Sequence, residues 1–177
     1  MKNILYIDCD GVILDTIETA FTMMKENNID ITNKYLVDYF FRNINWNYLI
    51  NNSMIINNAI EKIKILKNNN IYQDVVILTK LSGNYDEERL KRDTFFKLLP
   101  NIKVITLPRD YNKALVVPSI NNILIDDEDK NIASWNNYGG IGIKFTKDII
   151  DLDNNIINDL NDIENTSKVK MLRKTSK

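Results

Sequence analysis

Pairs of aspartates follow two short apolar segments of this sequence. Asp8 and Asp10 stand at the end of the first apolar segment, and Asp126 and Asp127 stand at the end of the fourth. If both segments are strands of one parallel sheet, their carboxyl ends meet at the edge where α/β sheets bind ligands. Carboxylates gathered there repel one another, and some would stay protonated unless a cation lies among them. Oxygen ligands in a small site without histidine favour Mg²⁺.

A hydroxyl and several cations fall near the same edge. Thr79 and Lys80 follow the second apolar segment, and Lys113 precedes the fourth. A hydroxyl, backbone amides and an ammonium beside a metal form a site suited to phosphate. Three other cations compete with Lys113 for this role: Lys91, Arg92 and Arg109.

The composition excludes other chemistries. The chain of 177 residues contains no histidine, which removes Ser-His-Asp and Cys-His catalysis as well as histidine metal sites. Cys9 is the single cysteine, so it cannot form an intrachain disulfide, and we expect it to pack as a small hydrophobe. The formal net charge of −1 offers no basic field for a nucleic-acid polymer, so any nucleotide ligand would be small.

Short β-branched runs alternate with helical patterns along most of the chain. The expected strands cover residues 4–7, 75–78, 104–107, 123–125 and 141–145. The expected helices are one capped by Ser53 with an apolar stripe from Ile56 to Leu66, one over residues 86–99 and one beginning near Asp129. This alternation predicts an α/β, doubly wound (Rossmann-like) fold, with a parallel sheet of about five strands and helices on both faces.

Residues 16–52 interrupt the alternation. The segment is helical in pattern, carries many aromatic side chains and would lie at the carboxyl end of the first strand. We therefore expect a small helical cap at 16–52, inserted into a core formed by residues 1–15 and 53–177. One or two of its aromatic side chains could stack on a nucleobase, since flat apolar walls suit such a ligand.

The two ends of the chain carry weaker signals. A helix is expected around residues 156–163, followed by a frayed basic end at 168–177. The first apolar stretch is too short for a signal peptide, and no later run approaches membrane-spanning length. We expect a cytoplasmic location without a membrane partner, and a homodimer is compatible with the sequence.

The aspartate pairs, together with Thr79 and Lys113, resemble the four motifs of the haloacid dehalogenase (HAD) superfamily. The motifs match in order and in strand placement, and the resemblance covers residues 4–145. It implies that Asp8 attacks phosphorus and becomes an aspartyl phosphate. It also implies that Asp10 protonates the leaving oxygen and then activates water.

The same resemblance implies the ligands. Mg²⁺ would be held by the Asp8 carboxylate and the Asp10 main-chain carbonyl, with Asp127 in direct contact and Asp126 acting through water. Three further groups would hold the phosphoryl oxygens and neutralise charge: the Thr79 hydroxyl, the Lys80 amide and the Lys113 ammonium.

A finer resemblance concerns the substrate. Segments 98–100, 108–113, 123–127, 131–135 and 139–143 look like the 5′(3′)-deoxyribonucleotidase branch of the superfamily, which hydrolyses (deoxy)nucleoside monophosphates to nucleoside and phosphate. Two departures are Lys80, where that branch has a serine, and the cap, which shows no motif of the branch. The alternatives are a phosphatase or phosphotransferase for another small phosphorylated metabolite, or a phosphate- or nucleotide-binding protein without turnover.

Overall fold

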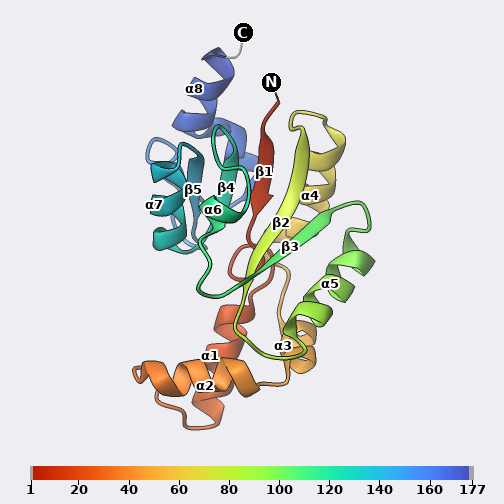
Figure 1. Cartoon of the computed structure of the whole chain (residues 1–177), viewed down its shortest axis with the longest axis vertical. Coiled ribbons are helices and arrows are strands. Elements are labelled where there is room, and N and C mark those ends of the chain that lie inside the picture. The colour runs from red at the N-terminus through yellow and green to blue at the C-terminus, as the bar shows by residue number, and fades with distance from the viewer. Residues whose placement is uncertain (1, 176–177) are drawn as a thin grey trace.

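The structure is a computed structural model that describes residues 2–175. Within these residues, six parallel strands form one sheet in the order β3-β2-β1-β4-β5-β6 (Figure 1). The strands are β1 (Ile4–Ile7), β2 (Asp74–Leu81), β3 (Lys103–Pro108), β4 (Ile123–Asp126), β5 (Ile141–Phe145) and β6 (Ile156–Ile157). The prediction of an α/β, doubly wound fold is confirmed, with one strand more than expected.

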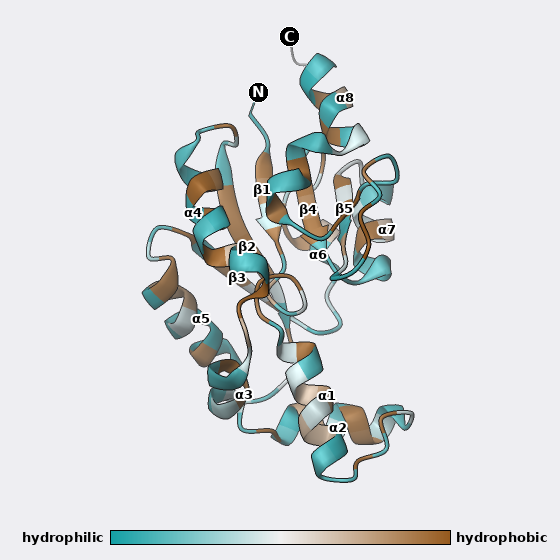
Figure 2. Ribbon diagram, turned by 180° about the vertical axis from the view of Figure 1, so that it is seen from behind, coloured by the Kyte–Doolittle hydropathy of each residue, from teal (hydrophilic) through white to brown (hydrophobic). Residues whose placement is uncertain are grey.

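Both faces of the sheet are covered, because successive side chains of a strand point to opposite faces. Leu5 and Ile7 of β1 belong to the larger apolar cluster. Tyr6, between them, belongs to a second cluster and packs edge-on against Trp135, with ring centroids 5.3 Å apart. The hydrophobic colouring of the central strands in Figure 2 reflects this burial on both sides.

Helices flank these strands. They are α4 (Ala59–Asn68), α5 (Glu87–Leu98), α6 (Lys113–Val116), α7 (Asp129–Asn137) and α8 (Ser167–Thr175). Ile60 and Ile63 of α4 and Phe95 of α5 enter the larger cluster, whereas Ala114 of α6 and Trp135 of α7 enter the smaller one. The observed bounds of α5 and α7 agree within one residue with the helices expected at 86–99 and from Asp129.

The segment at 16–52 forms three helices, α1 (Thr16–Glu26), α2 (Lys34–Asn43) and α3 (Trp46–Asn52). In Figure 1, α1 and α2 extend beyond the sheet at the end opposite the N-terminus, which is the end where β1 leads into the aspartates. Trp46 and Leu49 of α3 are buried in the larger cluster of the core. The segment is thus tied to the core by packing as well as by its chain connections.

The helix cap expected at Ser53 was wrong. Ser53 does not cap the next helix, because its hydroxyl donates to the Leu49 carbonyl at 2.7 Å at the end of α3. The chain reaches α4 only after Asn57 and Asn58, both at positive φ, and a short 3₁₀ helix (Ile56–Asn58).

The chain end is also more ordered than expected. Residues 156–163 do not form one helix, since Ile156–Ile157 pairs with β5 and a 3₁₀ helix follows at Leu160–Asn165. The basic end does not fray over the described part: Val169 of α8 is fully buried, and Arg173 donates to Glu164 at 2.8 Å. Burial of one apolar face holds this helix in place.

Candidate active site

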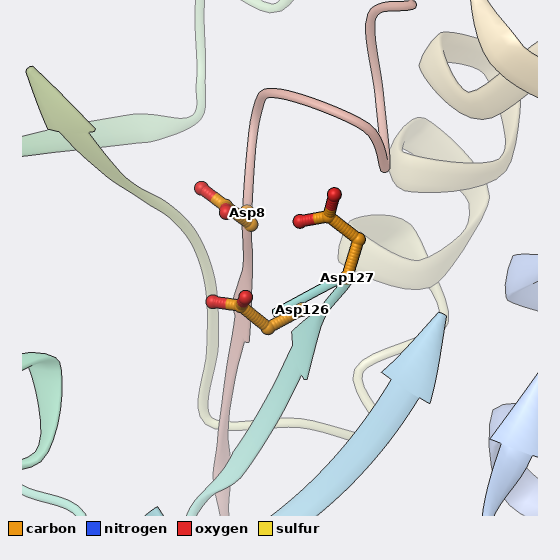
Figure 3. A group of neighbouring side chains, drawn as sticks. All are labelled: Asp8, Asp126 and Asp127. Atoms are coloured by element: carbon orange, nitrogen blue, oxygen red, sulfur yellow. The ribbon is translucent and has the colours of Figure 1, made fainter. Parts of the chain in front are cut away.

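Three carboxylates from neighbouring strands meet at one point (Figure 3). Asp8 follows β1, while Asp126 ends β4 and Asp127 comes next. Parallel pairing of β1 with β4 brings their carboxyl ends together, and the Asp8 amide donates to the Ile125 carbonyl at 2.9 Å. One oxygen from each carboxylate lies within 4.8 Å of the others. This spacing suits a single small cation with oxygen ligands.

Lys113 connects two of these carboxylates. Its Nζ lies 2.9 Å from Oδ1 of Asp8 and 2.7 Å from Oδ2 of Asp126, and its side chain is 1% exposed. The lysine opens the short helix α6, and the Asn112 side chain caps that helix by accepting from the Ala114 amide at 3.0 Å. The buried ammonium therefore stands at the position from which it can neutralise charge on Asp8.

Donors occupy most of the Asp126 carboxylate. Besides Lys113, the Asn131 amide group lies 3.0 Å from both oxygens, and the Glu128 backbone N–H donates to Oδ1 at 2.9 Å. A carboxylate engaged in this way has little capacity left for a cation. This geometry favours Asp8 and Asp127 as direct ligands and leaves Asp126 a supporting role.

The electrostatics of the cluster also fit a cation. Burial raises the pKa of Asp8 to about 8, and the neighbouring carboxylates Asp126, Asp10 and Asp127 add to the shift although Lys113 opposes it. Burial, followed by the charges of Asp126 and Asp10, raises the pKa of Asp127 to about 7. One ammonium thus does not balance the buried negative charge, and a divalent cation would.

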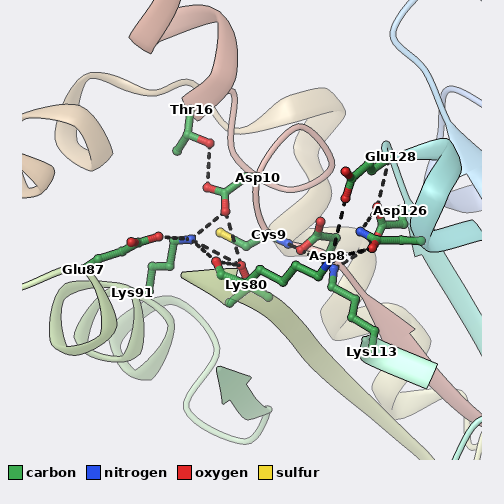
Figure 4. A network of polar contacts seen from close by, with 12 residues as sticks. Asp8, Cys9, Asp10, Thr16, Lys80, Glu87, Lys91, Lys113, Asp126 and Glu128 are labelled. Carbon is green, nitrogen blue, oxygen red and sulfur yellow. Dashed lines mark hydrogen bonds and ion pairs between the residues drawn. The ribbon is translucent and has the colours of Figure 1, made fainter. Parts of the chain in front are cut away.

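Asp10 lies in the part of the polar network that surrounds Lys91 (Figure 4). Its Oδ1 accepts from the Thr16 hydroxyl at 2.7 Å, and its Oδ2 accepts from Lys91 at 2.6 Å and from the Thr79 hydroxyl at 3.3 Å. Burial favours the neutral form of Asp10, but Lys91 and these hydroxyls outweigh it and hold its pKa below the ordinary value. Asp10 is therefore a carboxylate in this state.

The four candidate cations have different surroundings. Lys113 alone of the four pairs with Asp8, whereas Lys91 pairs with Asp10. Arg92 is exposed beside the edge strand β3, where it donates to the Thr106 hydroxyl at 2.6 Å. Arg109 forms an ion pair with Asp38 of α2 and so links the loop after β3 to the segment at 16–52. The pairing of Lys91 with Asp10 was not predicted, because the two residues lie 81 positions apart in the sequence. The one available signal was the i, i+4 spacing of Glu87 and Lys91, which indicates an ion pair on one helix face.

Thr79 and Lys80 lie at the end of β2, beside these groups. The Thr79 side chain is fully buried, and its hydroxyl reaches Asp10 and not the open cavity. The Lys80 ammonium donates to the Asn131 side chain at 2.8 Å and lies 3.8 Å from Glu128. Lys80 therefore reaches toward the start of α7, the helix that follows the acidic pair.

A cavity of about 420 Å³ opens above these residues. Asp8, Asp10 and Asp127 form its floor, and three side chains of the segment at 16–52 form one wall: Ile17, Phe41 and Trp46. Cys9 does not line it, since its side chain is fully buried and burial raises its thiol pKa well above the ordinary value. Its backbone N–H instead donates to Oδ1 of Asp8 at 2.8 Å. The cavity is large enough for a small phosphorylated metabolite.

Comparison with known proteins identifies the fold. No family model matches the sequence, and no curated protein matches it. A HAD-superfamily hydrolase from Ehrlichia chaffeensis is similar in structure, with a TM-score of 0.56 and 20% identity over 98% of this chain and 99% of that one. A HAD hydrolase from Bacillus subtilis, in a structure bound to magnesium, gives a TM-score of 0.62 and 14% identity over 93% and 97% of the two chains.

A subfamily IA hydrolase of the same superfamily from Geobacter sulfurreducens gives a TM-score of 0.59 and 12% identity, over 93% of this chain and 95% of that one. At these identities the similarity establishes the fold: this chain has the fold of HAD-superfamily hydrolases. Separately, none of the helices between residues 2 and 175 has the length and apolar character that crossing a membrane requires.

Proposed function

We propose that this chain is a Mg²⁺-dependent phosphomonoesterase that forms an aspartyl phosphate on Asp8. The observation that carries the proposal is the cluster of the buried Asp8 and Asp126 with the half-buried Asp127, and the Lys113 ammonium that contacts the first two. The shared fold with HAD-superfamily hydrolases supports it, and so does the magnesium in one of those structures.

Asp8 is held as a nucleophile would need to be. The Cys9 N–H and the Lys113 ammonium both bind Oδ1, so we assign Oδ2 as the attacking oxygen. Attack forms the bond from Oδ2 to phosphorus and breaks the bond from phosphorus to the leaving oxygen. Asp10, a carboxylate in the free protein, first takes up a proton from solvent and gives it to that oxygen. It then takes a proton from the water that hydrolyses the aspartyl phosphate and restores Asp8.

The residues present fit a magnesium ion. Asp8 and Asp127 would hold it directly with the main-chain carbonyl of Asp10, and Asp126 would act through water. When bound, Mg²⁺ supplies positive charge that lets an anionic phosphate approach an anionic carboxylate. Lys113 adds a second positive charge on the nucleophile, and the Lys80 amide would bind a phosphoryl oxygen. The Thr79 hydroxyl, expected at the phosphate, contacts Asp10 in this structure and would support that carboxylate.

The best single candidate for the substrate is a (deoxy)nucleoside monophosphate. Phe41 and Trp46 line the cavity above Asp8 and offer apolar surface to a base. Trp46 is 4% exposed, so Phe41, which is half-buried, is the more accessible of the two. Another small phosphorylated metabolite would use the same phosphate site with different contacts to the cap.

A substrate panel tests the proposal. Purified protein should release phosphate from nucleoside monophosphates or another small phosphomonoester with Mg²⁺ and stop in EDTA. Asp8→Asn should abolish turnover while the circular dichroism spectrum stays unchanged. Tight phosphate binding without turnover on any ester would indicate a binding protein, and transfer to an added alcohol would indicate a phosphotransferase. Halide release from a haloacid would contradict the proposal outright.

A further inference from the structure

Lys91 is a buried cation to which the steps above assign no role. Its side chain is 1% exposed, and its Nζ lies 2.6 Å from Oδ2 of Asp10 and 2.8 Å from Oε1 of Glu87 (Figure 4). The same ammonium lies 4.9 Å from the ring centroid of Trp46. A buried ammonium is tolerated only where partners replace its hydration. These contacts therefore determine where the Lys91 ammonium lies.

The partners of Lys91 are themselves held in place. Oε2 of Glu87 accepts from both the backbone N–H and the hydroxyl of Ser82, each at 2.6 Å. The indole N–H of Trp46 donates to the Phe41 carbonyl at 3.1 Å. The lysine is thus anchored on one side by the loop after β2 and on the other by the cap. It cannot turn toward solvent without leaving the buried Glu87 carboxylate short of its charged partner.

On its other side, Lys91 restrains the carboxylate that is proposed to move protons. Thr16 holds one oxygen of Asp10 and Thr79 contacts the other, but Lys91 provides the charged hydrogen bond, at 2.6 Å. Charge-assisted hydrogen bonds are roughly twice as strong as neutral ones. Proton transfer requires a donor placed within hydrogen-bond reach of the leaving oxygen, so small displacements of Asp10 matter.

We propose that Lys91 is the positioning residue for Asp10: its ammonium, anchored by Glu87 and Trp46, sets the placement of the carboxylate that transfers protons. This inference rests on the proposed phosphomonoesterase function. The two buried lysines then have separate tasks, because Lys113 contacts Asp8 and Asp126 while Lys91 contacts Asp10. Lys91 touches neither the phosphate nor the nucleophile in this role.

The test is a double variant, Lys91→Met with Glu87→Gln, which removes both charges and leaves no unpaired carboxylate on α5. Two esters are compared, the best alkyl phosphomonoester of the substrate panel and 4-nitrophenyl phosphate, whose leaving group departs without a proton. We expect kcat on the alkyl ester to fall ~100-fold, while the pre-steady-state burst of 4-nitrophenolate falls less than ~tenfold. KM for the alkyl ester should change less than about twofold, because Lys91 does not bind substrate.

Lys97→Met is the matched control, since Lys97 is exposed on the same helix and should leave both rates unchanged. Equal losses on the two esters in a folded double variant would overturn the proposal, as would unchanged rates.

If the double variant does not melt cooperatively, Lys91→Arg replaces it. Lys91→Arg keeps the positive charge but moves it, so we again expect a larger loss of rate on the alkyl ester than on 4-nitrophenyl phosphate. A ratio of these two rates equal to that of the wild type would overturn the proposal. Failure of the underlying function is distinct, because the wild type itself would then show no burst with any ester.

Discussion

Gly11 leaves the space that the Asp127 carboxylate occupies. A Cβ added at Gly11 would lie 2.7 Å from Cγ of Asp127 and would overlap with its Oδ2. The φ of Gly11 is +74°, a conformation that side chains with a Cβ adopt reluctantly. The loop that carries Asp8 and Asp10 can therefore pass close to the acidic pair only because residue 11 is glycine.

Gly11→Ala should abolish phosphate release, because the methyl group would displace the Asp127 carboxylate. The matched control is Gly139→Ala, which introduces the same kind of backbone strain at φ +79° but places the new Cβ 3.6 Å from Ile120, an ordinary contact. We expect both variants to lose ~1 kcal/mol or more of stability, and only Gly11→Ala to lose activity. Assays at a temperature well below both melting points separate the two effects.

Mg²⁺ should stabilise the protein through Asp8 and Asp127. A ligand at 100 times its dissociation constant adds about 2.7 kcal/mol to the free energy of unfolding, so the melting temperature should rise on replacing EDTA with excess Mg²⁺. Asp127→Asn should remove most of this rise, and Asp129→Asn, an exposed aspartate nearby, should keep it. An unchanged melting temperature in the wild type would argue against a metal site at these carboxylates.

The pH dependence of stability should depend on the metal. Burial raises the folded-state pKa of Asp8 to about 8 and of Asp127 to about 7, above the ordinary value of 3.8. The folded state thus binds these protons more strongly than the unfolded state. Their stabilising contribution is complete below the unfolded value and is lost as pH rises through the folded values.

In EDTA, the urea midpoint should therefore decrease between about pH 4 and pH 8, and Asp8→Asn should reduce that decrease. Saturating Mg²⁺ should also reduce it, since the cation takes over the role of the protons. A urea midpoint in EDTA that rises steadily over this interval would show that folding does not raise the pKa of these two carboxyl groups.

Removing Lys113 should cost both stability and activity. Lys113→Met leaves the buried Asp8 and Asp126 without their ammonium, and breaking a buried pair in this way costs ~3–5 kcal/mol. Adding Asp126→Asn to this variant should recover part of the stability and none of the phosphate release. Lys103→Met, at an exposed position that begins β3, serves as the control and should melt like the wild type. Equal melting temperatures for Lys113→Met and Lys103→Met would contradict this account.

The sequence by itself determined the sheet and the edge at which chemistry could occur. Continuous apolar runs identify buried parallel strands, and an aspartate directly after such a run must lie at the carboxyl edge. Asp8, Asp10, Asp126 and Asp127 could be placed there without a structure, and the absence of histidine left few other options. The two-residue strand β6 gave no such signal, because it pairs only in the context of its neighbour β5.

Only the tertiary structure decided which cation faces which carboxylate. Lys91 and Lys113 both precede β4 in the sequence, and nothing local distinguishes a lysine that meets Asp10 from one that meets Asp8. The distinction arises from the packing of α5 beside α3 and of α6 beside the acidic pair, which brings Lys91 to Asp10, 81 positions away in the sequence. Pairings across such distances depend on how whole elements pack, and for that reason periodicity and spacing did not reveal them.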